Sequence, residues 1–378
     1  MAVRKRKWTT RKGEIKEAWI VQYLDADGID RIRTFDRKKD ADAYQDTVRI
    51  DVRKGLHTPP SKSATVAEAA EAWFDHVKAN GMNGRGPAER ATLRQYRQHI
   101  DLHIGPRIGR DKLASLTSKS VERFQKELLA DMSRALAKKV FTSFKSLLKV
   151  AKYGHVADGL VIGSEKRKRK LEAGRDFPTT DEVKRLIDAA SGRHRALLLV
   201  AAIAGLRASE LRGLRWSDVD FKAAELHVRQ RADRWNTIGP PKSDSSLRTV
   251  PLDQATIAAL KVWKLACPKG EAGVVFPNAT GGIEHHKNAL RSLAPIMIAA
   301  GVVDKAGRPK YGLHDFRHFF ASWCINPKNR GGRELPAKVV QELLGHSSIM
   351  VTLDLYGHLF PRSDDRSELD AASRVLLG

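Results

Sequence analysis

Two breaks in the sequence pattern divide this chain and limit what it can fold into. The first, GLHTPPSKS at residues 55–63, contains two adjacent prolines, which continue neither a helix nor a strand. The second, EKRKRKLEAGRD at residues 165–176, contains consecutive basic residues from Lys166 to Lys170, whose like charges repel and favour an extended chain. A chain of 378 residues is also too long for one ordinary compact domain. We therefore predict three domains, at residues 1–58, 64–163 and 177–378, with a basic linker at 164–176.

The first segment has the pattern of a small sheet backed by a helix. Residues 19–35, WIVQYLDADGIDRIRTF, alternate on either side of a DADG turn and predict a hairpin. The helical stretch after it has one apolar face, formed by Ala41, Tyr44, Val48 and Val52. We expect a three-stranded sheet plus helix that binds DNA through a basic strand surface carrying Arg31 and Arg33. The alternative is a solvated appendage without a binding role.

The second segment is predicted to be a helical domain with a basic rim. Thr65 and Glu68 have the spacing of a capping box at the start of its first helix. Four helices follow one another, and each carries basic residues on a face away from its apolar stripe. A single run of charge is usually a solvated face, but four helices of one sign favour a surface that contacts DNA. The candidate contacts are Arg90, Arg94, Arg97, Lys139, Lys145 and Lys149.

The charge of the whole chain supports a polyanionic partner. The chain has 68 Lys and Arg against 44 Asp and Glu, a formal net charge of +24, and nucleic acid is the commonest partner for such an excess. A merely soluble basic protein is the alternative. The two cysteines, Cys267 and Cys324, form no CxxC pair, and no apolar run reaches transmembrane length. We expect a reduced, cytoplasmic setting, associated with the nucleoid and without a membrane partner.

The third segment mixes helices with short strands and contains two candidate cationic groups. The apolar run ALLLVAAIAG predicts a buried helix, and Arg207 follows it at a break, with Glu210 three residues on to hold the guanidinium. ELHVRQR and RTVPL read as two paired strands, and the loop between them puts Lys242 near the tip of a hairpin. The complete chain is therefore expected to be multidomain and mainly α, with small β elements and a mixed α/β third domain.

Near the C-terminus, histidines, an arginine and a tyrosine occur at regular spacings. His314, Arg317 and His318 are three and four residues apart, so LHDFRHFF places them on one face if it is helical. The helix AKVVQELL is predicted to end at Gly345, which directs His346 out of the helix end. Tyr356 lies ten residues beyond His346. Zinc is disfavoured at these histidines because no Cys or carboxylate completes a ligand set at metal spacing.

The motifs AGLRASEL, HDFRH, LGHSS and the tyrosine that follows resemble those of the tyrosine recombinases, the phage integrase family. The resemblance covers the plan of the whole chain, with an arm-binding domain, a core-binding helical domain and a catalytic domain. The chain departs from the family pattern at NPKNRGG, which looks like a lengthened loop between HDFRH and LGHSS. Six residues occur in family order, and the resemblance implies that they are catalytic: Arg207, Lys242, His314, Arg317, His346 and Tyr356.

The chemistry of DNA strand transfer explains these residue types. A tyrosine with a pKa of ~10 is a poor nucleophile at neutral pH, and arginines are suited to clamp the oxygens of a phosphate with paired donors. The resemblance implies that Tyr356 forms a 3′-phosphotyrosyl link and that His346 adds a donor to the phosphate. It also makes His314 the acid/base near the tyrosine and Lys242 the acid for the departing 5′ oxygen. It implies no metal, ATP or other cofactor. His318 is interpreted as a structural neighbour.

These expectations predict a site-specific integrase of a phage or other mobile element. Its partners would be double-stranded DNA attachment sites, bound by a homotetramer, with a host DNA-bending protein and an excisionase as possible accessories. One alternative is a type IB topoisomerase, which uses similar chemistry to relax DNA. The other is a catalytically inactive DNA-binding regulator.

Overall fold

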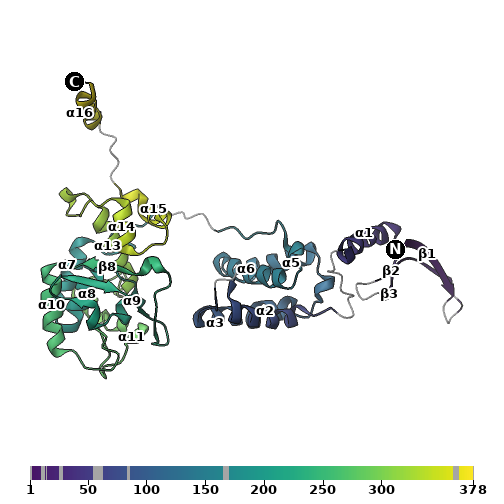
Figure 1. Cartoon of the computed structure of the whole chain (residues 1–378), viewed down its shortest axis with the longest axis horizontal. Helices are drawn as coiled ribbons and strands as arrows, with labels where there is room; N and C mark the ends of the chain where they lie inside the picture. The colour runs from purple at the N-terminus through teal and green to yellow at the C-terminus, as the bar shows by residue number, and fades with distance from the viewer. Residues whose placement is uncertain are drawn as a thin grey trace. The chain divides into compact units, whose positions relative to one another are not determined.

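A computed structural model describes residues 2–9, 13, 15–24, 29–53, 63–82, 86–164, 170–360 and 366–377. Contacts within the chain divide it into two compact units, Met1–Lys166 and Arg167–Gly378, and each is described here by itself (Figure 1). None of the helices in these described ranges is both long enough and apolar enough to span a membrane.

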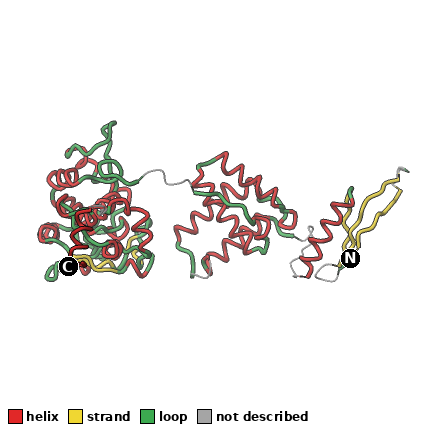
Figure 2. Tube along the Cα trace, turned by 90° about the horizontal axis from the view of Figure 1, so that it is seen from above, coloured by secondary structure: helices red, strands yellow, loops and turns green. Residues whose placement is uncertain are grey.

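The first unit begins with an antiparallel sheet, in the order β1 (Ala2–Thr9), β2 (Ile15–Leu24) and β3 (Asp30–Phe35). Helix α1 (Lys38–Arg53) packs on one face of this sheet (Figure 2). Val21 and Tyr23 of β2 form a small core with Ala41 and Val48 of α1, so the predicted sheet and helix are confirmed. The predicted DADG turn and the side chain of Val52 lie outside the described residues.

Strand register decides which basic residues share the face that α1 covers. Arg33 pairs with Val21 and Arg31 with Tyr23, so both arginines lie on the α1 side of the sheet. The Arg33 guanidinium lies 4.5 Å from the centre of the Tyr44 ring. The open face instead presents Arg4 and Arg6, because they pair with the β2 residues whose side chains point away from α1. The arginines predicted for a DNA-contacting strand surface are therefore beside the helix.

The remainder of the first unit is helical. It consists of α2 (Val66–Asn80), α3 (Arg90–His99), a π-helical turn (Ile100–Ile104) that continues into α4 (Gly105–Ile108), α5 (Ser118–Asp131) and α6 (Arg134–Val150). The predicted capping box between Thr65 and Glu68 is present at the start of α2. Trp73, Phe124 and Phe144 are fully buried in the core of these helices. The apolar faces predicted for these helices therefore pack together in one hydrophobic core.

The second unit is built around α8 (Gly192–Ala204), which is apolar on nearly every side and therefore buried. Helices α10 (Gln254–Ala266) and α13 (Leu313–Ile325) pack against it. A small antiparallel sheet has the order β4 (Val219–Asp220), β5 (Glu225–Val228), β8 (Arg248–Pro251). The other helices are α7 (Thr180–Ala189), α9 (Ala208–Gly213), α11 (His286–Arg291), α12 (Ala294–Ala299), α14 (Ala337–Leu344), α15 (Ile349–Tyr356) and α16 (Arg366–Leu377). The chain is mainly α with small sheets, as predicted.

The segment between β5 and β8 differs from the prediction. The two strands pair as expected, with Leu226 opposite Val250. However, a second two-stranded hairpin, β6 (Arg231–Ala232) and β7 (Ile238–Gly239), is inserted between them. Lys242 follows this hairpin and does not lie at its tip. The backbone pairing of this hairpin ends at Gly239, before the two prolines that precede Lys242. A hairpin with two residues in each strand is too short to be predicted from alternation of apolar and polar residues.

Candidate active site

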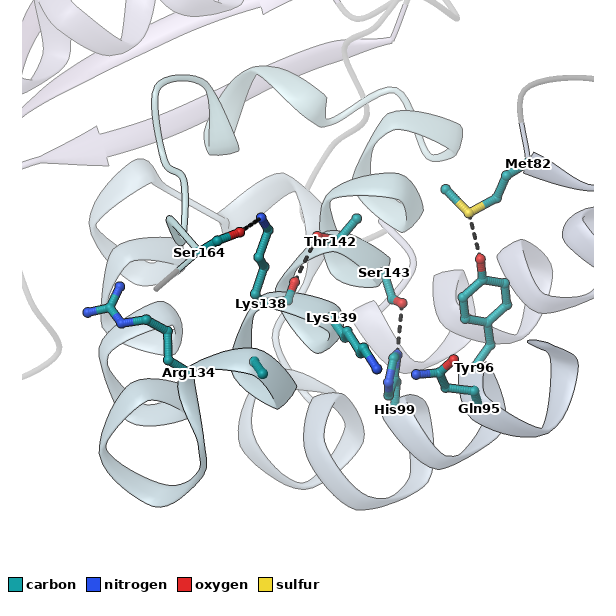
Figure 3. A pocket seen from close by; sticks show the side chains of 11 residues that line it. Met82, Gln95, Tyr96, His99, Arg134, Lys138, Lys139, Thr142, Ser143 and Ser164 are labelled. Atoms are coloured by element: carbon teal, nitrogen blue, oxygen red, sulfur yellow. Dashed lines mark hydrogen bonds between the residues drawn. The ribbon is translucent and has the colours of Figure 1, made fainter. Parts of the chain in front are cut away.

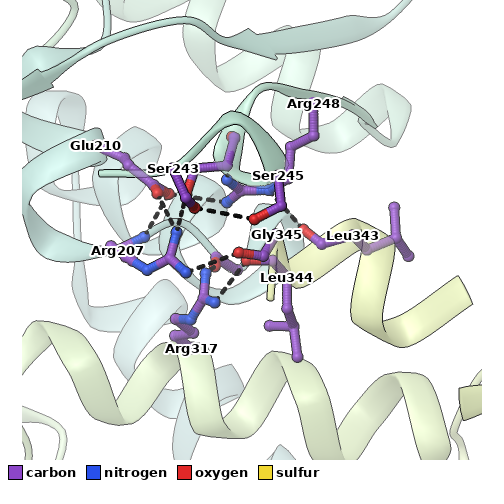
Figure 4. A network of polar contacts seen from close by, with 11 residues as sticks. Arg207, Glu210, Ser243, Ser245, Arg248, Arg317, Leu343, Leu344 and Gly345 are labelled. Carbon is purple, nitrogen blue, oxygen red and sulfur yellow. Dashed lines mark hydrogen bonds and ion pairs between the residues drawn. The ribbon is translucent and has the colours of Figure 1, made fainter. Parts of the chain in front are cut away.

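Arg207 is held at the centre of a polar network (Figure 4). It caps the start of α9, and its Nη1 donates to Glu210 Oε1 at 2.6 Å and to the Ser246 hydroxyl at 3.1 Å. Its Nη2 donates to the carbonyl of Gly345 at 2.8 Å. The predicted role of Glu210 in holding this guanidinium is therefore confirmed. Three segments far apart in the sequence meet at one arginine that remains 30% exposed.

Glu210 also binds a second arginine, Arg248, which is not among the site residues predicted from the sequence. Arg248 Nη2 donates to Glu210 Oε2 at 2.8 Å, and its Nε donates to the Leu343 carbonyl at 2.7 Å. The Glu210 side chain is only 2% exposed, and the two nearby arginines keep the pKa of its carboxyl low against the effect of burial. In the sequence, Arg248 is marked only by its position at the start of the predicted second strand.

Arg317 is buried on α13 and donates to two backbone carbonyls. Its Nη1 reaches Gly205 at 2.8 Å and its Nη2 reaches Leu344 at 2.6 Å. Gly205 needs to be a glycine, because its φ is +58° and a Cβ there would lie 2.2 Å from the Phe320 ring. Burial and then the positive charges of Arg207 and Arg248 together lower the pKa of Arg317 to about 9. Arg207 and Arg248 thus bind the carboxylate of Glu210, and Arg317 lies near enough for its charge to interact with all three groups.

His346 comes directly after the left-handed Gly345 that ends α14, as predicted. The side chain is 8% exposed, and its Nδ1 makes a 2.9 Å hydrogen bond with the hydroxyl of Thr352 on α15. Its pKa is lowered to about 4, mainly by burial and then by the positive charges of Arg317, Arg207 and Arg248. The imidazole is therefore neutral at neutral pH.

Tyr356 ends α15, and its ring is 1% exposed, packed among Phe320, Cys324 and Leu344. Its hydroxyl makes a 2.7 Å hydrogen bond with Nδ1 of His318. The family resemblance predicts His314 beside the tyrosine, with His318 as a structural neighbour. The structure instead brings His318 to the hydroxyl, because His318 lies one helical turn farther along α13.

His314 lies on the exposed side of this pair. Its ring meets that of His318 edge to face, with centres 4.9 Å apart. Its pKa is lowered by the protein atoms packed around the ring and then by the charge of Arg317. The predicted common face of the two histidines is confirmed, but they occupy different positions relative to Tyr356.

Lys242 is the predicted site residue with the fewest contacts. Its side chain is exposed, and it has no hydrogen bond or ion pair to another described residue. Its neighbour Ser243 is better anchored, since the Ser243 hydroxyl hydrogen bonds with that of Ser246 at 3.1 Å. Ser246 in turn accepts from Arg207, so the Lys242 segment is joined to the arginine network.

Among the basic residues predicted to contact DNA in the helical part, two are engaged within the protein. Arg97 forms a paired interaction with Glu71 at 2.7 and 2.9 Å and lies over the ring of Phe74. Lys145 donates to the carbonyl of Leu160 at 2.9 Å. The other four side chains are exposed, namely Arg90, Arg94, Lys139 and Lys149.

A pocket of about 590 Å³ opens between α3 and α6 in the helical part (Figure 3). Its rim carries Arg134, Lys138 and Lys139, and the buried His99 lines its interior. His99 Nδ1 makes a 2.9 Å hydrogen bond with the Ser143 hydroxyl, and burial lowers its pKa to about 4, together with the charges of His103 and Lys139. A basic rim around an apolar floor is therefore built into this surface.

Comparison with known proteins identifies the family of the second unit. Residues 177–362 match the model of the phage integrase family, and this stretch contains every residue of the arginine, histidine and tyrosine arrangement described above. The chain belongs to the tyrosine recombinase family. This tyrosine recombinase is 27% identical over 359 residues to a XerC-like tyrosine recombinase of Caldanaerobacter subterraneus subsp. tengcongensis, covering 86% of this chain and 87% of that protein. It is therefore an enzyme that cleaves and transfers DNA strands.

Solved structures share the fold of this recombinase. The Tn1549 transposon integrase in complex with transposon right end DNA has a TM-score of 0.61 at 19% identity, over 82% of this chain and 99% of that one. A lambda integrase tetramer bound to a Holliday junction has a TM-score of 0.51 at 18% identity, over 95% of this chain and 97% of that one. At these identities the likeness concerns the arrangement of helices and small sheets.

Proposed function

We propose that this recombinase integrates or excises a mobile element by cleaving DNA at specific attachment sites through a 3′-phosphotyrosyl intermediate on Tyr356. The observation that carries the proposal is a cluster of three arginines, two of them bound to the carboxylate of Glu210 and the third to backbone carbonyls, beside a tyrosine and two histidines. Such a cluster holds more positive than negative charge in a partly buried place. A phosphodiester is the complementary anion, and its negative charge increases in the transition state.

The phosphate would be bound by Arg207, Arg317 and His346. Arg207 is partly exposed and already oriented by Glu210, so it loses little freedom when it clamps an oxygen. Because the Thr352 hydroxyl can donate to Nδ1 of His346, the Nε2–H of that ring is available for a phosphate oxygen. Arg248 would act through Glu210 and keep this carboxylate in place.

The tyrosine would transfer its proton to His318 as it attacks phosphorus. The hydrogen bond between the two groups already has the length needed for proton transfer. The bond between the phenolic oxygen and phosphorus forms while the bond to the 5′ oxygen breaks, and Lys242 gives its proton to that oxygen. His314 stays a proposed acid/base, on the exposed side of His318. The buried tyrosine ring has to leave its packing site to meet a phosphate, so DNA binding is proposed to move the end of α15.

The rest of the chain would bind DNA. We propose that residues 1–58 bind arm-type sites and that residues 64–163 bind the core of the attachment site. The linker at 164–176 would follow the phosphates between the helical and the catalytic domain. The related proteins support a homotetramer on two duplexes, because the lambda integrase structure is a tetramer on a Holliday junction. A host DNA-bending protein and an excisionase are proposed accessories, and the nucleoid is the proposed place of action.

The test uses an attachment site mapped by sequencing the junctions of the integrated element. The wild-type chain should form a covalent complex with that DNA and recombine two copies of the site. Tyr356→Phe should bind equally well but form no covalent complex, with recombination reduced by at least roughly 10⁴-fold. Recombination that survives this change would refute the nucleophile assignment. Relaxation of any supercoiled plasmid, independent of sequence, would favour a topoisomerase, and binding without cleavage by the wild type would favour an inactive regulator.

A further inference from the structure

Helix α9 touches the Lys242 segment on both sides. Arg207 is the N-cap residue of this helix, and its guanidinium donates to the Ser246 hydroxyl at 3.1 Å. Ser246 is 1% exposed and hydrogen bonds with Ser243, the residue that directly follows Lys242. The C-terminal side of the lysine is therefore fixed to the start of α9.

The N-terminal side of the segment is fixed to the other end of the same helix. Gly213, the last residue of α9, lies so close to the β6–β7 hairpin that a Cβ would be 2.6 Å from the backbone nitrogen of Ala232. Arg212, beside it, is 5% exposed. Its Nη1 donates to the carbonyl of Asp233 at 3.1 Å, and its Nη2 donates to Oδ1 of Asn236 at 2.5 Å.

Arg212 fastens the tip of the hairpin to the body of the unit as well. Its Nε donates to the carbonyl of Glu284 at 2.7 Å. Asn236 has a left-handed φ of +64° at the tip, and its Nδ2 donates to the carbonyl of Ile283 at 3.2 Å. A single guanidinium thus joins α9, the hairpin and the 283–284 loop. None of these contacts reaches the arginine cluster itself.

The connection from the hairpin to Lys242 is short and stiff. After β7 ends at Gly239, only Pro240 and Pro241 precede the lysine. The proline rings fix φ at both positions, so the orientation of the hairpin is passed on with little freedom. Lys242 itself makes no hydrogen bond or ion pair with the described residues, so its position depends on the two anchored sides.

We propose that Arg212 is a positioning residue for Lys242. By holding the hairpin at the end of α9 opposite to Arg207, it places the lysine ammonium near the phosphate that Arg207 binds. The inference rests on the proposed role of Lys242 as the proton donor to the 5′ oxygen. Without Arg212 the hairpin can shift, and proton transfer to the leaving oxygen slows while attack by Tyr356 remains intact.

The test compares two leaving groups. One attachment-site substrate carries the normal 5′ oxygen at the cleaved bond, and the other carries a bridging 5′ sulfur, which leaves as a thiolate and needs no proton. Arg212→Met should cleave the oxygen substrate at least roughly tenfold more slowly than wild type and the sulfur substrate within about threefold of it. Lys242→Ala should show the same pattern with a larger defect. The double variant with Arg212→Met and Lys242→Ala should cleave the oxygen substrate at nearly the same rate as Lys242→Ala alone.

Three further variants sharpen the comparison. Arg212→Lys keeps the charge but has fewer donors, and it should fall between wild type and Arg212→Met. Asn236→Gly retains the left-handed backbone but removes the side-chain acceptor, so it replaces Arg212→Met if that variant fails to fold. Arg185→Met is the matched control, because Arg185 on α7 also donates to a backbone carbonyl, that of Ala300, and this variant should match wild type on both substrates.

The outcomes separate the two proposals. If Lys242→Ala is rescued by sulfur and the Arg212 and Asn236 variants are equally slow on both substrates, only the positioning role of Arg212 is overturned. If sulfur does not rescue Lys242→Ala, the acid role of Lys242 is overturned, and the role of Arg212 falls with it. If the sulfur substrate restores cleavage by Lys242→Ala, Arg212→Met and Asn236→Gly, both proposals are supported.

Discussion

Among single residues, Tyr356 and His318 make the contact that joins the proposed nucleophile to its proposed proton acceptor. Tyr356 is buried and its hydroxyl hydrogen bonds with Nδ1 of His318, whereas the ring of His314 packs edge to face against that of His318. A resting tyrosine held in this way is protected from solvent. It also has a proton acceptor in contact before DNA arrives.

Replacement of either histidine distinguishes their roles. His318→Asn keeps a polar atom near the position of Nδ1 but cannot take up a proton, so covalent-complex formation should slow by about 10²-fold, with DNA affinity unchanged. His314→Asn should leave a smaller defect. Single-turnover cleavage of the attachment site measures both. A severe defect in His314→Asn beside normal cleavage by His318→Asn would mean that the contact with Tyr356 is only structural.

The buried histidine His346 makes stability depend on pH. Its folded pKa of about 4 lies below the usual value of 6.5, so between these values the unfolded chain binds more protons than the folded one. The free energy of unfolding should therefore decrease as the pH falls from 6.5 to 4, by at most about 3 kcal/mol from this group. Denaturant unfolding at several pH values measures the slope. His346→Asn should flatten it, and an unchanged slope would contradict the assignment.

At the scale of elements, the small N-terminal sheet has two unlike faces. The face toward α1 carries Arg31 and Arg33 among aromatic side chains, while the open face carries Arg4 and Arg6. Arg4 also donates to Gln22 at 2.6 Å on that open face. An open strand face with arginine and amide groups is suited to contacts in a DNA groove.

This arrangement predicts different effects for arginines on the two faces. Arg4→Gln with Arg6→Gln should remove protection of the DNA that flanks the core of the attachment site, as seen by footprinting. Arg33→Gln should leave that protection in place and lower the stability of the sheet by about 0.5–1 kcal/mol, through loss of the contact with Tyr44. Loss of flanking protection in Arg33→Gln alone would place the binding face on the α1 side.

At the scale of the whole molecule, the net charge of +24 and the two-unit division suggest a chain that binds DNA through several segments at once. The linker between the units adds five consecutive basic residues, of which Lys170 lies among the described residues. A run of basic residues can neutralise phosphates without a folded binding surface.

Salt dependence measures this contribution. Affinity for the attachment site should fall by at least roughly 10³-fold between about 50 and 200 mM salt. Replacing the run from Lys166 to Lys170 by glutamine should reduce the slope of log affinity against log salt by up to about 4. Arg97→Gln is the control, because Arg97 is paired with Glu71 and should leave the slope unchanged. An unchanged slope for the linker variant would exclude the linker from phosphate contact.

Sequence patterns alone predict the mainly α character, the N-terminal sheet and helix, the capping box at Thr65 and the family motifs. They do so because these features depend on local periodicity and on residue types at short spacings. The ion pair between Glu210 and Arg207 could also be predicted, because the two residues are three positions apart at the start of a helix.

The pairing of groups far apart in the sequence becomes visible in the folded chain and not in the sequence pattern. Arg248 joins Glu210 from a strand 38 residues away, and His318 reaches Tyr356 across 38 residues as well. The face of Arg33 depends on strand register, which one residue of slip would reverse. Arg212 gains its contacts from a hairpin too short for its pattern to be recognised. Local patterns specify elements, while packing between elements selects the partners of each side chain.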